Sequence, residues 1–178
     1  IKKSHGEADV VVANNVFAHV PDVFDVAEGV RAVLTEGGLF VFEVSYLMDM
    51  TEAPLFDTIY HEHMSYHAVK PLALMLDKLG MPIVDVHWNK DQVGRGSLRV
   101  VACKTKGRSI DCEAARELMR MEAFYGLWNG WFWSRLGGQI FKVGLTVRSW
   151  LEMLVNMGEK VAGYGAAAKL TTLMYAFK

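Results

Sequence analysis

Hydrophobic and polar positions along the first part of the chain predict a strand, a helix and a second strand. Residues 8–15, ADVVVANN, are a continuous apolar run that ends in two asparagines, which is typical of a buried parallel strand. Valines then recur at helical spacing between Asp22, a candidate N-cap, and Gly37-Gly38, a candidate end. Residues 38–46, GLFVFEVSY, predict another buried strand. This order predicts a βαβ unit, which binds its ligands at the carboxyl ends of the strands.

The pattern continues with a helix and two strands that lack a helical crossover. The helix begins near Pro71, a tolerated first-turn position, and closes at Gly80. Residues 82–88 and 97–104 read as strands. Because their connection is too short for a crossover helix, we expect an antiparallel pair at the end of a parallel sheet.

The last third of the pattern is mostly helical. Ser109 is a candidate cap, and breaks are predicted at Gly126, Gly130 and Gly137-Gly138. Residues 160–177 then predict a strand, a glycine turn and the start of a helix, as at the beginning of a second α/β unit.

Composition narrows the classes of protein to consider. The 178 residues are 52% hydrophobic and 22% charged, which is typical of a globular protein. A formal net charge of −1 gives no overall field for nucleic acid or a membrane surface, and no apolar run is long enough for a transmembrane helix. Two cysteines, Cys103 and Cys112, are too few for a disulfide framework, so we expect a cytoplasmic protein. Because the chain opens on Ile1 and stops after one short predicted helix, we expect truncation at both ends.

Candidate chemistry is densest in residues 56–67, FDTIYHEHMSYH. The H-E-H spacing differs from the H-E-x-x-H of zinc proteases and lacks an assignable further ligand, so a metal site is disfavoured. A polar surface loop is the second interpretation. The third is a proton-transfer site, because Tyr60, Glu62 and His63 supply a hydroxyl donor, a carboxylate and an imidazole just beyond a strand end.

His19 favours the proton-transfer interpretation. It lies just past the end of the preceding strand, so its loop and the Tyr60–His63 loop should leave the same sheet edge and converge. A lone histidine before a helix is more often a packing or capping residue. The expected convergence of the two loops is the reason for favouring an active-site role for His19 over packing or capping.

Five stretches together resemble a known family. ADVVVANNVFAHVPD, GLFVFEVSYL, FDTIYHEHMSYH, GRGSLRVV and GYGAAAKLTTL occur in the order and at about the spacing of the sugar C-methyltransferases. These S-adenosylmethionine-dependent enzymes methylate a carbon of a dTDP-linked 4-keto-deoxysugar. The resemblance runs from about residue 8 to the C-terminus and is densest at Tyr60–His63.

The resemblance implies an architecture. We expect an α/β fold: the second half of a class I, Rossmann-like methyltransferase sheet with a terminal antiparallel strand pair, then helices and the start of a second α/β domain. The expected boundaries are 1–105 for the methyltransferase part, 106–158 for a helical connector and 159–178 for the start of the nucleotide-sugar-binding domain. The family's glycine-rich cofactor loop and its N-terminal zinc-binding domain would precede Ile1, so we expect the fragment itself to be inactive.

The resemblance also assigns roles to residues. His63 is similar to the general base that takes the proton from the carbon next to the ketone, with Glu62 and Tyr60 in the same site and His19 as the other active-site histidine. Either Tyr60 or His19 could donate to the enolate oxygen. Asn14 and Asn15, at the strand end beside the cofactor's methionyl end, are candidate cofactor contacts or simple turn caps.

GYGAAAK resembles the family's nucleotide-sugar-binding turn. Gly163, Tyr164 and Gly165 form the turn, where glycines allow close backbone approach, and Lys169 adds charge for the diphosphate. Leu170 stands where the family commonly has glycine.

Three other functions stay open at this point. One is O- or N-methylation of a nucleotide sugar, which needs no base for a carbon acid. The second is a metal-dependent hydrolase built on H-E-H, and the third is a non-catalytic nucleotide-sugar-binding module.

Overall fold

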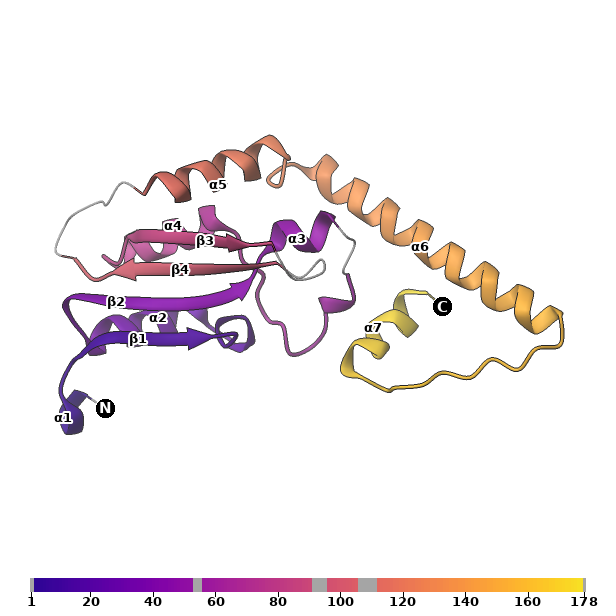
Figure 1. The fold of residues 1–178 in the computed structure, drawn as a ribbon, viewed down its shortest axis with the longest axis horizontal. Helices are drawn as coiled ribbons and strands as arrows, with labels where there is room; N and C mark the ends of the chain where they lie inside the picture. Colours follow the sequence, from indigo (N-terminus) through magenta and orange to yellow (C-terminus); the bar gives the residue numbers. More distant parts are fainter. Residues whose placement is uncertain (1, 53–55, 91–95, 106–111, 178) are drawn as a thin grey trace.

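The computed structural model describes residues 2–52, 56–90, 96–105 and 112–177 (Figure 1). The described residues form a four-stranded sheet, and its strands lie in the order β1-β2-β4-β3. The strands are β1 (Ala8–Asn14), β2 (Leu34–Ser45), β3 (Ile83–Asn89) and β4 (Ser97–Cys103).

The sheet is mixed in direction. β1 and β2 are parallel, whereas β4 is antiparallel to both β2 and β3. The last strand in the sequence is therefore inserted between β2 and β3, and β3 runs in the direction of β1 and β2. The α/β class and the terminal antiparallel pair predicted from the sequence are confirmed.

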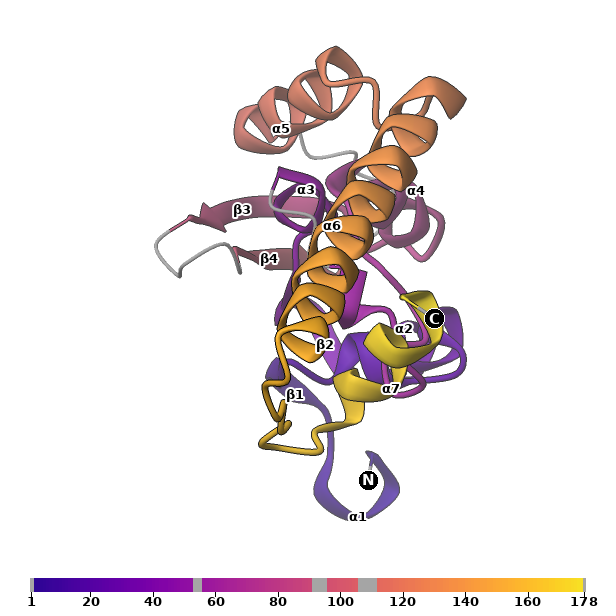
Figure 2. The same ribbon diagram turned by 90° about the vertical axis from the view of Figure 1, so that its right-hand side faces the viewer.

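One face of the sheet carries the core. Alternate residues of β2 and β4 point to this face because successive side chains of a strand alternate in direction. Figure 2 shows the helices α2 (Val23–Val33) and α4 (Val69–Lys78) on the same side of the sheet. The fully or almost fully buried residues of β2 and β4 are Leu34, Phe40, Phe42, Val44, Leu98, Val100 and Ala102.

β1 is buried on one face only, which corrects the prediction of a fully buried strand. Val10 and Val12 are 52% and 61% exposed, whereas Val11 and Ala13 pack against the core. β1 lies at the edge of the described sheet, and α2 and α4 lie on one side only. A continuous apolar run therefore does not mean burial on both faces here.

The junction between α2 and β2 also differs from the prediction. Asp22 caps α2 as expected, with its carboxylate accepting from the N–H groups of Phe24 and Asp25. However, α2 ends at Val33, before Gly37-Gly38, because Leu34 already pairs with Ala8 in the sheet.

Two helices follow the sheet, α5 (Glu113–Phe124) and α6 (Gly130–Asn156). Gly126 separates them with a φ of 75°, a conformation that favours glycine, so this predicted break is confirmed. The predicted break at Gly137-Gly138 is wrong, since α6 continues through both residues. Glycine in a helix costs about 1 kcal/mol and does not forbid the helix.

Of the described helices, none combines the length and the hydropathy required to cross a bilayer.

The C-terminal segment contains a helix but no strand. The strand predicted near residue 160 is wrong: residues 159–167 are extended, exposed and outside the described sheet, and α7 (Ala168–Ala176) follows them. A strand needs a partner edge, and this segment lies apart from the sheet as it turns back from the far end of α6 to α7 (Figure 1). Ser109, the candidate cap, lies outside the described residues. The remaining elements are short: α1 (Lys2–His5), η1 (Phe17–His19), α3 (Leu47–Glu52) and η2 (Phe56–Thr58).

A buried carboxylate joins three elements of the fold. Glu122 of α5 is fully buried and accepts hydrogen bonds from the N–H groups of Val69 and Lys70, the first two residues of α4. The Tyr46 hydroxyl donates to the same carboxylate at 3.1 Å. Ala68 supplies no side-chain cap for α4, so Glu122 acts as the cap from another helix. Burial raises the pKa of Glu122 above its usual value, against the effect of these donors.

We expect Glu122→Ala to lower the free energy of unfolding by about 3 kcal/mol or more, because two backbone N–H groups and a phenol lose their acceptor in the core. Chemical denaturation measures this loss. Glu117→Ala, at an exposed position of the same helix, should change stability by no more than about 0.5 kcal/mol. Equal effects of the two substitutions would refute the capping role.

Candidate active site

Two loops leave the carboxyl ends of β1 and β2 and are hydrogen-bonded to each other. The N–H groups of Met64 and Ser65 donate to the carbonyl oxygen of Ala18, at 2.9 and 3.3 Å. The rings of His19 and His63 consequently lie with their centroids 4.9 Å apart. The convergence expected from the sequence is therefore present in the structure.

Buried neighbours explain why η1 holds this position. Phe17 is fully buried against Phe40 and Phe42 of the sheet, while His19, at the end of the same short helix, is exposed. His67 stacks on Phe17, and its Nε2 lies 3.1 Å from the Ser65 hydroxyl. Burial lowers the pKa of His67 to about 4, so this imidazole is neutral and serves the packing of the loop.

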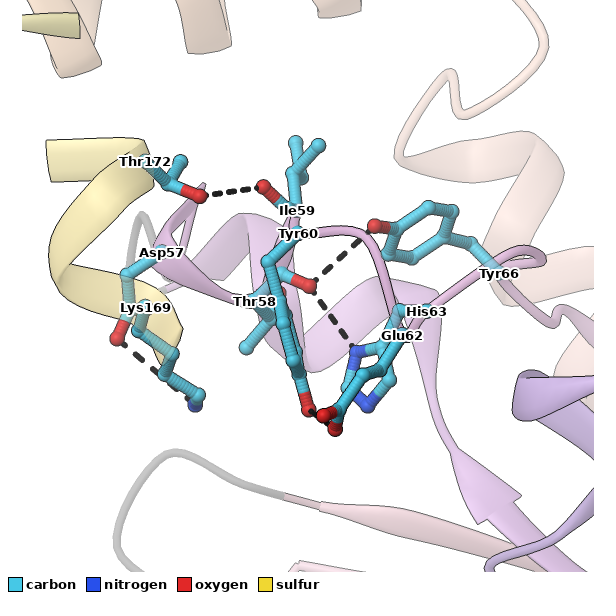
Figure 3. A network of polar contacts seen from close by, with 9 residues as sticks. All are labelled: Asp57, Thr58, Ile59, Tyr60, Glu62, His63, Tyr66, Lys169 and Thr172. Atoms are coloured by element: carbon cyan, nitrogen blue, oxygen red, sulfur yellow. Dashed lines mark hydrogen bonds and ion pairs between the residues drawn. The ribbon is translucent and has the colours of Figure 1, made fainter. Parts of the chain in front are cut away.

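The proton positions on His63 follow from its hydrogen bond. Its Nδ1 lies 3.0 Å from the carbonyl oxygen of Thr58 (Figure 3). A carbonyl oxygen can only accept, so Nδ1 must carry the hydrogen. In the neutral ring, Nε2 then holds a free lone pair and can take a proton. The Tyr66 hydroxyl donates to the same carbonyl at 3.3 Å.

The same reasoning applies to His19. Its Nδ1 lies 2.8 Å from the backbone carbonyl oxygen of Glu62, so Nδ1 donates there and Nε2 is the acceptor of the neutral ring. In both histidines, Nδ1 thus donates to a backbone carbonyl, and Nε2 remains available for another partner.

Tyr60 and Glu62 complete the cluster. The Tyr60 hydroxyl donates to Glu62 Oε2 at 3.2 Å, and the Tyr60 and His63 ring centroids lie 4.6 Å apart. Partial desolvation and the neighbouring Glu62 carboxylate raise the pKa of Tyr60, which keeps the phenol protonated. His61 is exposed, with its Nε2 3.9 Å from Glu62 Oε1.

The surroundings of His63 favour its neutral form. Burial lowers its pKa most, and the nearby His19 and Lys169 lower it further, whereas the Thr58 carbonyl and Glu62 act in the opposite direction. The net result is a pKa below the ordinary value of 6.5. A half-buried, neutral imidazole with a free Nε2 can act as a base near pH 7.

No group of three or more His, Cys, Asp or Glu side chains in the described ranges is placed to hold a metal ion.

Asn14 and Asn15 lie at the carboxyl end of β1, a few residues before His19. Both side chains are exposed. Asn15 has a φ of 53°, uncommon for a residue other than glycine, and its N–H donates to the Glu43 carbonyl at 2.9 Å. The two exposed amides thus lie at the sheet edge from which the loop to His19 leaves, and each can both donate and accept hydrogen bonds.

The structure places the residues of the predicted nucleotide-sugar turn in two different surroundings. Gly163, Tyr164 and Gly165 are exposed in the extended segment before α7, with open space around both glycines. Lys169, in contrast, lies on α7 with its Nζ 3.8 Å from Asp57 Oδ2, beside the loop (Figure 3). Of these four residues, the structure brings Lys169 to the site.

Sequence reasoning missed three residues that shape the cluster. The Thr58 carbonyl orients His63, and Tyr66 donates to that carbonyl. Thr172 donates to the Ile59 carbonyl at 2.8 Å from a helix more than a hundred residues away. Tyr66 belongs to the dense stretch and could have been proposed, whereas a backbone carbonyl and a distant threonine leave no local signal.

Solved structures similar to this chain include methyltransferases. A chain of the complex between the Haloferax volcanii Trm112 methyltransferase activator and a methyltransferase aligns with a TM-score of 0.48 and 13% identity, covering 56% of this chain and 55% of that one. The N-methyltransferase NodS from Bradyrhizobium japonicum aligns with a TM-score of 0.43 and 15% identity, over 58% and 55%. Both scores are below 0.5.

Two sequence comparisons agree with each other. C-methyltransferase NovU from Streptomyces niveus is 34% identical over 176 residues, which are 99% of this chain and 41% of NovU. The chain thus spans less than half the length of this relative. Residues 92–178 match the sequence model of the C-methyltransferase C-terminal domain. From β1 to α7, the chain belongs to the C-methyltransferase family.

Proposed function

We propose that the protein to which this chain belongs uses S-adenosylmethionine to methylate a carbon next to the ketone of a dTDP-linked 4-keto-deoxysugar. The observation that carries the proposal is the His19–His63 pair, in which the free Nε2 of a half-buried, neutral His63 lies beside Tyr60 and Glu62. The sugar and its nucleotide rest on the family resemblance of the motifs.

The chemistry requires a base and a donor. A proton on carbon next to a ketone is weakly acidic, so His63 Nε2 takes it while the C–H electron pair moves toward the ketone oxygen and forms an enolate. A positioned base contributes about 10²–10⁴-fold, and a hydrogen-bond donor to the developing oxyanion about 10²–10³-fold. The carbon of the enolate is then the nucleophile.

Tyr60 is the better candidate for the oxyanion donor. Its phenol is protonated, and rotation about the C–O bond can turn its O–H from the Glu62 side chain to an enolate oxygen. The Nδ1–H of His19 already donates to the Glu62 backbone carbonyl, and Nε2 of that ring carries a hydrogen only in the imidazolium form. We therefore assign Tyr60 to the enolate oxygen and His19 to holding the Glu62 backbone beside it.

The cofactor side of the proposal uses the carboxyl end of β1. S-adenosylmethionine supplies the electrophilic methyl group, and Asn14 and Asn15 would contact its polar end.

The division into a methyltransferase part (1–105), a helical connector (106–158) and the start of a nucleotide-sugar-binding domain (159–178) belongs to the same proposal. In this proposal, zinc is bound only by a further N-terminal domain of the longer protein. The free thiols of Cys103 and Cys112 agree with a cytoplasmic location.

Lys169 is the residue of this chain that we propose for the substrate diphosphate. Its ammonium lies beside Asp57, in residues 56–67, which we call the catalytic loop. The Gly163–Gly165 segment that leads into α7 is exposed, with open space around its glycines. Glycines there would let the backbone approach the phosphates, and lysine would add a positive charge.

The first test is deuterium exchange at the carbon next to the ketone. The full-length enzyme without methyl donor, in D₂O with the dTDP-4-keto-deoxysugar, should exchange that hydrogen, as followed by NMR. His63→Asn should slow exchange by about 10²–10⁴-fold. His87→Asn, at an exposed position on β3, serves as the control and should exchange like the wild type.

Exchange that survives His63→Asn would contradict the role of His63. Absence of exchange in the wild type, together with methyl transfer to an oxygen or nitrogen of the sugar, would replace this proposal by O- or N-methylation. Binding of the nucleotide sugar with neither reaction would indicate a non-catalytic binding module.

The second test is the titration of His63 in the free enzyme. Its pKa should lie below 6.5, so the basic form decreases only as the pH falls well below neutrality. Lys169→Met removes a positive charge that disfavours the imidazolium, so the pKa of His63 should rise. NMR of ¹⁵N-labelled histidine measures both values, with Lys160→Met, an exposed lysine of the preceding segment, as the control. A pKa that stays unchanged or falls in Lys169→Met would contradict the electrostatic coupling.

A further inference from the structure

α7 contacts the catalytic loop just before Tyr60. The Thr172 hydroxyl donates to the Ile59 carbonyl at 2.8 Å, and Lys169 lies 3.8 Å from Asp57 (Figure 3). The Phe177 ring, just after α7, lies 5.1 Å from the ring of Phe56. One short helix thus fixes a stretch of the loop that is far from it in sequence.

The fixed stretch contains the carbonyl that orients the base. Thr58 lies between Asp57 and Ile59, and its oxygen accepts from Nδ1 of His63. A rotation of the peptide groups around Ile59 would turn that oxygen away from Nδ1, after which the ring could rotate or move its hydrogen to Nε2. The base would then lose both its direction and its free lone pair.

α7 is also held to α6, through the residue that follows it. The Phe177 ring packs against Gly144 of α6, so closely that a Cβ at this glycine would lie 2.5 Å from a ring carbon. Gly144 is the one buried residue of α6. The contacts thus run from α6 through Phe177 and α7 to residues 56–59 and from there to His63.

We propose that Thr172 is a positioning residue for His63, which it acts on through the Ile59–Thr58 backbone. This inference rests on the proposed function and extends it. α7 follows the segment that we assign to the diphosphate, so the helix that receives the nucleotide sugar also aligns the base. Capture of the substrate and removal of its proton therefore depend on one structural element.

The test compares two neighbouring threonines in the full-length enzyme. Thr172→Val keeps the shape and removes the hydroxyl, and Thr171→Val makes the same change at an exposed position one residue earlier. Thr172→Val should slow deuterium exchange at saturating substrate about tenfold, since small misplacements of a catalytic group cost up to about 10²-fold. The KM for the nucleotide sugar and the midpoint of thermal unfolding should stay near wild-type values. Thr171→Val should behave as wild type, and Thr172→Ser, which keeps a hydroxyl, should restore most of the rate.

A second readout does not need turnover. The ¹⁵N shifts of His63 report which ring nitrogen carries the hydrogen, and the fraction with hydrogen on Nδ1 should fall in Thr172→Val but not in Thr171→Val. If Thr172→Val exchanges like the wild type while His63→Asn does not exchange, the positioning role is wrong and the proposed function stands. If the wild type does not exchange at all, the proposed function is wrong, and unchanged His63 shifts in Thr172→Val would then overturn the positioning role as well.

Discussion

The candidate site depends on one backbone contact, the hydrogen bonds from Met64 and Ser65 to the Ala18 carbonyl. They join the loop after β1 to the loop that follows β2 and α3, and they do so at the sheet edge where parallel strands present their carboxyl ends. The His19 Nδ1–H donates across the same two loops to the Glu62 carbonyl. These contacts together bring the two imidazole rings into one site with Tyr60 and Glu62.

Backbone carbonyls determine the tautomers of the two histidines in that site. Thr58 and Glu62 each accept from Nδ1 of a histidine, which leaves both Nε2 atoms available in the neutral rings. The side chains alone would allow either tautomer, so the loop conformation decides which nitrogen can act as a base. Burial and nearby positive charge then keep His63 neutral, and the two effects together suit proton removal from a weak carbon acid.

Much of the sheet could be predicted because its signals are local. Apolar runs, the Asp22 cap and the short connection before β4 predicted the elements and the antiparallel pair, and strand-end geometry predicted that His19 and His63 meet. The exposed face of β1 and the unbroken α6 could not be predicted in this way, because they depend on which neighbours cover a strand and on the tolerance of a helix for glycine. The same limit applies to Thr172 and to the Glu122 cap, whose partners are distant in sequence.

The most direct test of the central claim is a crystal structure of the full-length enzyme with the dTDP-4-keto-deoxysugar bound. The account predicts that His63 Nε2 lies about 3–3.5 Å from the carbon next to the ketone, with Nδ1 on the Thr58 carbonyl and His19 across the same cavity. A sugar bound away from both rings, or a His63 that points Nε2 into the protein, would contradict it.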